Sequence, residues 1–182
     1  MQTLAILVGS LRSASINRQL ANGLAEIGPD LFKFNQLKLD EVPIFNEELE
    51  QNPPAAVVTM KQSLKAADGV LIITPEYNRS MPALVKNTLD WASRPYGDNS
   101  WTGKPVAVAG MSPGAVGTAV CQSQLRSVLG FLGARQMTQP EIYLTYAAGF
   151  FDANGNVANE RTRTFLRKFL ESFGTWINKN KN

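Results

Sequence analysis

The amino-acid sequence predicts an α/β protein, a doubly wound five-stranded parallel sheet with helices on both faces. Short apolar runs alternate with helical patterns about five times along the 182 residues, which is typical of such sheets. The runs at 3–9 and 70–74 are almost wholly apolar, as strands covered on both faces are. Because no repeat, low-complexity tract or linker interrupts the pattern, we expect one domain over residues 1–182.

The first strand and helix carry the clearest local signals. After the strand at 3–9, Ser15 can cap a helix whose apolar residues recur at helical spacing until Gly28-Pro29 ends it. The segment 31–37 alternates between apolar and polar residues and indicates an edge strand. The acidic, proline-bearing segment 40–54 is expected to be a loop.

The middle of the chain predicts helix, strand and helix in turn. A helical pattern covers 55–67 and includes Val58 among its apolar residues, and the buried strand at 70–74 follows it. Ser80 and Pro82 then mark a further helix start, because proline is favoured in the first turn of a helix.

The last third of the chain predicts two strands and two helices. A long polar and aromatic connection at 93–103 leads to a strand at 104–110, a glycine-rich turn at 112–117 and a helix closed by Gly133. A weak strand is expected within 135–144. The final helix has an apolar stripe made of Phe165, Leu166, Phe169, Leu170, Phe173, Trp176 and Ile177.

The composition excludes several kinds of catalytic site. The sequence has no histidine and a single cysteine, Cys121, so Ser-His-Asp and Cys-His nucleophilic sites, His-based metal sites, multi-cysteine zinc sites and CxxC redox pairs are all excluded. We therefore expect no metal centre, and an enzyme of this composition would draw its chemistry from a bound cofactor.

Charge and hydropathy bear on partners and location. The chain has a net charge of +3, but from Glu160 onward there are six basic and two acidic residues, and Lys181 is one of the six. The excess thus lies on a terminal helix and tail, which favours a solvated helix face over a nucleic-acid site. No apolar run approaches the roughly 20 residues of a membrane span, and no signal peptide is evident, so we expect a cytoplasmic protein without membrane contact.

Ligands of such folds bind beyond the carboxyl ends of the strands, so the loops at 9–17, 75–81 and 111–117 are the candidate sites. The first offers a helix N-terminus, serine hydroxyls and Arg12, which suit one terminal phosphate. It lacks both GxxxxGK[ST] and GxGxxG. The alternative is a polar turn in which Ser15 merely caps the helix.

The other two loops suit a planar ligand. Between Pro75 and Pro82, Tyr77 offers a flat apolar face and Asn78 offers both a donor and an acceptor. The alternative is a rigid connector with an outward-facing aromatic side chain. The small residues at 112–117 would let a flat ring approach the backbone, and the alternative there is a simple tight turn.

Three segments, GSLRSASIN, TPEYNRSMPALVKNTLDWASR and SPGAVGTAVCQSQLR, resemble the NADPH-dependent FMN reductase family, which includes quinone, chromate and azo-dye reductases. The resemblance covers most of the chain in the correct order and implies a flavodoxin-like fold. It implies FMN as cofactor, NADPH or NADH as electron donor and a small-molecule electron acceptor. It implies that the flavin carries the chemistry, in a ping-pong reaction, so that no residue is itself catalytic.

The resemblance also implies particular contacts. Pro113 departs from the family pattern, in which many members have a smaller residue, and removes a backbone donor. The family tends to form homodimers or homotetramers, and Tyr96 and Trp101 would suit such an interface. The implied cofactor-binding residues are Ser10, Arg12, Ser15, Ile16 and Asn17 for the phosphate, Pro75, Glu76, Tyr77 and Asn78 for the ring, and Ser112 and Gly114 from the third loop.

Two other classes of protein remain as alternatives. A flavodoxin-type electron carrier would bind FMN without oxidising NAD(P)H itself, but such carriers are usually strongly acidic and have a threonine-rich phosphate loop. A receiver-type regulator needs acidic residues at the end of the first strand, where Val8-Gly9-Ser10 supplies none.

Overall fold

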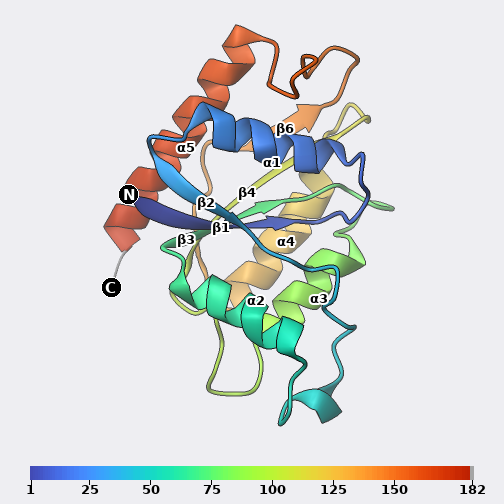
Figure 1. Cartoon of the computed structure of the whole chain (residues 1–182), viewed down its shortest axis with the longest axis vertical. Helices are drawn as coiled ribbons and strands as arrows, with labels where there is room; N and C mark the ends of the chain where they lie inside the picture. Colours follow the sequence, from blue (N-terminus) through green and yellow to red (C-terminus); the bar gives the residue numbers. More distant parts are fainter. Residues whose placement is uncertain (181–182) are drawn as a thin grey trace.

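The computed structural model describes residues 1–180 and contains a parallel sheet with strand order β2-β1-β3-β4-β5, with β6 also paired to β4 (Figure 1). This is the flavodoxin-like order, and it confirms the predicted fold class. Lys181, one of the basic tail residues, lies outside the described part. The strands are β1 (Gln2–Val8), β2 (Phe32–Gln36), β3 (Gly69–Ile73), β4 (Pro105–Ser112), β5 (Arg135–Gln136) and β6 (Ile142–Thr145).

The single weak strand expected within 135–144 is divided in two. β5 pairs with the start of β4, and β6 pairs with its end from Ala109 to Ser112. Between them lies Pro140, which has no N–H to donate to a strand ladder. Both pieces occupy the same edge of the sheet, beside β4, so the five-position architecture is preserved.

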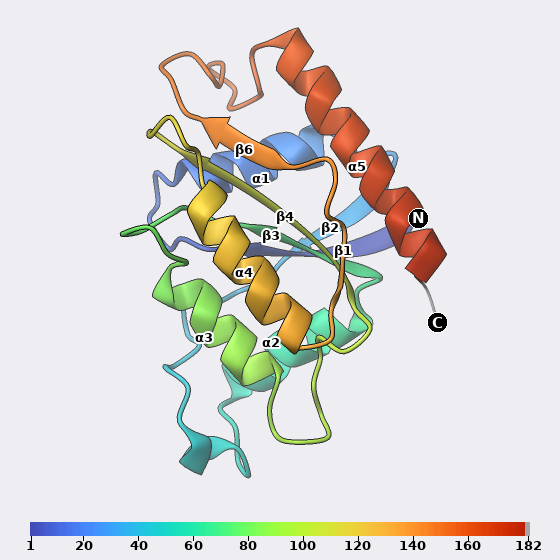
Figure 2. The same cartoon turned by 180° about the vertical axis from the view of Figure 1, so that it is seen from behind.

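Helices cover both faces of the sheet. Figures 1 and 2 show α1 and α5 on one face and α2, α3 and α4 on the other. A short 3-10 turn, η1 (Glu47–Leu49), lies in the segment expected to be a loop, where Asn46 caps it by accepting from the Glu48 N–H at 3.1 Å. The helices are α1 (Ile16–Ile27), α2 (Ala55–Ala66), α3 (Ala83–Ala92), α4 (Ala119–Phe131) and α5 (Glu160–Asn180).

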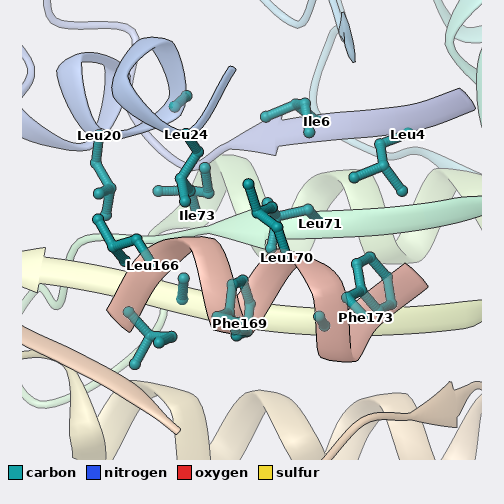
Figure 3. Packing of buried hydrophobic residues seen from close by; sticks show 14 of the residues in the cluster. Leu4, Ile6, Leu20, Leu24, Leu71, Ile73, Leu166, Phe169, Leu170 and Phe173 are labelled. Carbon is teal, nitrogen blue, oxygen red and sulfur yellow. The ribbon is translucent and has the colours of Figure 1, made fainter. Parts of the chain in front are cut away.

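The core consists of two apolar layers, one on each side of the sheet. Because side chains alternate along a strand, Leu4 and Ile6 of β1 face α1 and α5, while Ala5 and Leu7 face α2, α3 and α4. Figure 3 shows how the leucines of α1 and the stripe of α5 meet over the sheet. The predicted stripe of α5 is thus confirmed, except that Phe165 at its start is 39% exposed.

Two sequence expectations about side chains were wrong. Val58 is 37% exposed, because the buried stripe of α2 runs through Val57, Met60 and Leu64 instead. Trp101, expected at an interface, is fully buried and donates its indole N–H to the carbonyl of Leu89 at 3.2 Å. It anchors the long connection after α3 to the core. Within residues 1–180, none of the helices has the length and hydropathy that crossing a membrane requires.

The packing of α5 allows a test of the apolar layer that lies between the sheet and helices α1 and α5. Phe173 is fully buried against β2 and β3, whereas Phe165 on the same helix is partly exposed. Phe173→Ala should lower the free energy of unfolding by about 3–5 kcal/mol, because it leaves a cavity. Urea denaturation measures the loss. The matched Phe165→Ala change should cost less than about 1.5 kcal/mol, and equal losses would contradict the packing described.

Candidate functional site

Three loops meet at the carboxyl edge of β1, β3 and β4, the middle strands of the sheet (Figure 1). The N–H of Gly9 donates to the carbonyl of Ile73 at 2.8 Å, and the N–H of Thr74 donates to that of Ala109 at 3.0 Å. These bonds extend the pairing of β1 with β3, and of β3 with β4, by one residue beyond the strands. The first two loops therefore begin at matching positions along the sheet. The three loops singled out in the sequence therefore share one edge of the sheet, although the first and the third are more than 90 residues apart in the chain.

The first loop ends in a helix N-terminus with unpaired donors. Ser15 is the cap of α1, and its hydroxyl accepts from the Arg18 N–H at 3.3 Å, which confirms the predicted capping. Ile16 and Asn17 come next, and their N–H groups have no carbonyl four residues earlier within the helix. Ser10 is buried, with its hydroxyl 3.4 Å from the Arg12 N–H, while the Arg12 side chain is exposed.

Asn17 has a different position from the rest of the loop. Its side chain is 1% exposed and reaches β4, where the amide oxygen accepts from the Met111 N–H and the amide nitrogen donates to the Met111 carbonyl, both at 2.9 Å. The side chain thus ties the start of α1 to the end of β4. The backbone N–H of Asn17, at the second position of α1, still faces the open end of the helix.

The second loop contains a tight hairpin with strained backbone. Tyr77 and Ser80 exchange two backbone hydrogen bonds, of 3.0 and 2.9 Å. Between them, Asn78 and Arg79 have φ angles of 51° and 62°, the left-handed values at both central positions that a type I′ turn requires. Glycine is the usual second residue there, and an arginine in this region is uncommon. Tyr77, Asn78 and Arg79 are all exposed at the tip.

Glu76 connects this hairpin to α4. One carboxylate oxygen accepts from the Cys121 N–H at 3.0 Å, and the other lies 3.3 Å from the Arg79 guanidinium. Thr118, the residue before α4, makes no side-chain cap of its own. Glu76 therefore caps this helix from another segment. The negative charge of its carboxylate suits the positive end of the helix. The Glu76 side chain is 7% exposed.

The third loop is a tight turn, as one reading of the sequence expected. The Ser112 hydroxyl accepts from the Gly114 N–H at 3.0 Å, and the Gly117 N–H donates to the Gly114 carbonyl at 3.0 Å. Gly117 has a φ of 59°, and a Cβ there would lie 3.0 Å from the Tyr143 backbone. Residues 113–116 are exposed at the same edge as the hairpin.

The cysteine beneath these loops is not a reactive thiol. Cys121 is fully buried, with its sulfur 3.6 Å from the hydroxyl of Thr74. Burial raises the pKa of the thiol above its ordinary value, and the nearby Glu76 carboxylate adds to this shift. Because the thiolate is the nucleophilic form, the side chain serves as a small apolar residue between β3 and α4.

The residues present fit a phosphorylated planar cofactor. A phosphate needs several N–H and O–H donors and a positive charge, and the start of α1 offers two backbone N–H groups beside Ser10 and Arg12. A flat ring needs apolar surface and backbone polar groups held in place. The hairpin with Tyr77 and the turn around Gly114 provide such groups, each restrained by its own hydrogen bonds.

Comparison with known proteins agrees with this fit. The family model described as NADPH-dependent FMN reductase matches residues 1–149. The chain belongs to this family. It is 45% identical to a 2-hydroxy-1,4-benzoquinone reductase of Burkholderia sp over 96% of this chain and 95% of the relative, and 39% identical to a quinone reductase of Pseudomonas putida over 98% and 96%.

A solved structure extends the similarity to the fold. FerB, a flavoenzyme NAD(P)H:(acceptor) oxidoreductase from Paracoccus denitrificans, superposes with a TM-score of 0.95 at 42% identity, covering 99% of each chain. Like the other members of the NADPH-dependent FMN reductase family, the protein is an FMN-dependent NAD(P)H oxidoreductase with a small-molecule acceptor. The predicted enzyme class is confirmed, in place of the electron carrier.

Sequence reasoning missed the residues that hold the reductase loops from behind. Gln124 of α4 accepts from the Ser80 hydroxyl at 2.7 Å and donates to the Arg79 carbonyl at 3.0 Å. Glu76 was expected to line the ring, and its role as a cap of α4 was not foreseen. The available signal was spacing, since Cys121 and Gln124 are three residues apart and so lie on one face of a helix.

A variant of Asn17 tests whether its side chain stabilises the fold or contacts the phosphate. Asn17→Ala leaves the Met111 N–H and carbonyl without their partner, and unsatisfied buried polar groups are costly, so the free energy of unfolding of the FMN-free protein should fall by about 2–4 kcal/mol. Urea denaturation checks this. Exposed Asn52→Ala should change it by less than about 0.5 kcal/mol. If Asn17→Ala weakened only FMN binding, the bridge would not be stabilising the fold.

Proposed function

We propose that this reductase binds FMN across the carboxyl edge of β1, β3 and β4 and passes reducing equivalents from NAD(P)H to a quinone. The observation that carries the proposal is the start of α1, where unpaired backbone donors adjoin Ser10 and Arg12. The proposed contacts are Ser10, Arg12, Ser15, Ile16 and Asn17 for the phosphate, Pro75, Glu76, Tyr77 and Asn78 for the ring, and Ser112 and Gly114 from the third loop.

The phosphate subsite combines hydrogen-bond donors with positive charge. The first N–H groups of α1 point out of the helix end, which carries partial positive charge. Arg12 adds a full charge with a forked geometry suited to phosphate oxygens. Ser15 contributes differently, because its hydroxyl already caps α1. Its backbone N–H is also committed, because it donates to the Arg12 carbonyl at 3.1 Å, so its available donor is the hydroxyl O–H. We therefore assign backbone N–H contacts to Ile16 and Asn17 and a hydroxyl contact to Ser15.

The ring subsite depends on backbone groups that cannot move easily. Pro75 stiffens the entry to the hairpin, and Glu76 acts through its hold on α4, so its carboxylate contributes by positioning. Bound FMN supplies the redox chemistry, accepting a hydride equivalent and giving it up again. With no histidine in the chain, the protein's part is to orient donor and acceptor in turn at one site, which implies ping-pong kinetics.

The acceptor we favour is a quinone. Tyr77 is 52% exposed at the hairpin tip, so its ring offers a flat surface beside the mouth of the site. Relatives with 45% and 39% identity are named as quinone reductases. Chromate and azo compounds are further acceptors that an open site of this kind would admit.

We further propose that one domain, residues 1–182, assembles as a homodimer or homotetramer in the cytoplasm. Tyr96 is 87% exposed and Phe131 is 90% exposed, and both line one surface hollow with Leu132. Exposed aromatic side chains gathered in one place favour an interface. The Arg94 guanidinium stacks 3.8 Å above the Tyr96 ring, which holds that ring outward.

The proposal is tested first on the purified protein. It should be yellow, release FMN on denaturation and lose its visible absorbance when NADPH or NADH is added without oxygen. A quinone should then restore the absorbance, and initial rates should give parallel double-reciprocal lines. A protein that neither takes up FMN nor oxidises NAD(P)H would overturn the proposal.

The phosphate subsite predicts the effect of Arg12. Arg12→Gln should raise the dissociation constant for FMN roughly 10- to 100-fold, because a hydrogen bond to a charged group contributes about 1.5–3 kcal/mol. Quenching of FMN fluorescence measures it. The control is Arg161→Gln, an exposed residue on α5, which should leave the constant unchanged. Equal affinity of both variants would contradict the assignment of Arg12.

The aromatic hollow predicts the oligomeric state. The wild-type protein should elute with light-scattering mass at a multiple of 19.9 kDa. Tyr96→Glu combined with Phe131→Glu should shift it toward the monomer, because buried unpaired charges are costly at an interface. Ile44→Glu, at another exposed apolar residue, should not. A monomeric wild-type protein, or an unaltered mass in the double variant, would refute the proposed interface.

A further inference from the structure

The hairpin of residues 77–80 has a conformation that suits Asn78 but not Arg79. Both central residues have left-handed φ angles, and Arg79 has the cost of a Cβ in that region. The tip is exposed, so packing does not hold it. Strained backbone persists only where surrounding contacts impose it. The two backbone bonds between Tyr77 and Ser80 close the turn, and further contacts come from the element behind the hairpin.

Gln124 supplies them from α4. Its amide oxygen accepts from the Ser80 hydroxyl at 2.7 Å, and its amide nitrogen donates to the Arg79 carbonyl at 3.0 Å. One turn earlier on the same helix, the Cys121 N–H holds the Glu76 carboxylate. The two ends of the hairpin are thus fixed to successive turns of one helix.

We propose that Gln124 is a positioning residue for the flavin, which holds residues 77–80 in the conformation that faces the ring. This rests on the proposed function, in which the ring lies against the hairpin. Without the amide, the turn keeps its two backbone bonds but loses both contacts to α4, so the peptide after Arg79 leaves the left-handed geometry more readily. FMN binding would then have to order the hairpin itself. Affinity falls when a binding segment is ordered only on binding.

The variants isolate the two hydrogen bonds. Gln124→Leu keeps the size of the side chain and removes both bonds, and Ser80→Ala removes one. The matched control is Gln62→Leu, at an exposed glutamine of α2 on the same face of the sheet. Gln124→Leu should raise the dissociation constant for FMN about five- to tenfold and shift the visible absorption maxima of the bound flavin. Gln62→Leu should do neither.

Two combined variants separate positioning from general stability. Because Ser80 and Gln124 act through a shared contact, adding Ser80→Ala to Gln124→Leu should weaken FMN binding no further. Arg79→Gly creates Asn-Gly, the pair that type I′ turns prefer. It should therefore restore at least half of the lost FMN affinity in the Gln124→Leu background.

The outcomes are distinguishable. If wild-type protein and Gln62→Leu bind FMN and Gln124→Leu binds it equally well with an unaltered spectrum, Gln124 does not position the flavin and the inference fails alone. A loss in Gln124→Leu that Arg79→Gly does not restore would also overturn it, since the hairpin conformation would not be the cause. If wild-type protein binds no FMN, the proposed function itself fails.

Discussion

The site depends on the pair of hydrogen bonds between the Asn17 side chain and the Met111 backbone. Parallel strands place their following loops at one edge, but they do not fix how a helix start is oriented relative to a loop two strands away. The Asn17 amide does this, because it joins the first turn of α1 to the last residues of β4 inside the core. Its two donor–acceptor contacts define both distance and direction, so the first N–H groups of α1 have one position relative to the end of β4.

A second constraint comes from α4, which lies across the sheet from α1 (Figure 2). Its first turns contact the strained hairpin through Cys121 and Gln124, and they take their cap from Glu76 rather than from Thr118. The helix and the hairpin are therefore mutually dependent. The carboxylate caps the helix, and the helix in return restrains a turn in which Arg79 has an unfavourable left-handed backbone. Such strain is typical of functional sites in a rigid framework.

Local patterns predicted most of the fold, because strands, helix caps and apolar stripes depend on residues a few positions apart. The Ser15 cap and the stripe of α5 are of this kind. The errors arose where tertiary packing decides. Val58 and Val57 are equally apolar, and only the direction of the sheet selects Val57, while Trp101 is drawn into the core by a loop with no local pattern. The Asn17–Met111 and Ser80–Gln124 contacts span 94 and 44 residues, so no local spacing reveals them.

These long-range contacts explain why the loop motifs point to one edge of the sheet without giving the roles of their residues. A motif gives the residue types present, but the same asparagine or glutamate can face a ligand or brace a neighbouring element. Asn17 and Glu76 have their side chains committed to β4 and α4. In a protein whose redox chemistry belongs to a flavin, this division follows from the task. A chain that has to hold a rigid cofactor needs loops of fixed geometry, and the Asn17 and Glu76 side chains supply this by bracing the loops from behind.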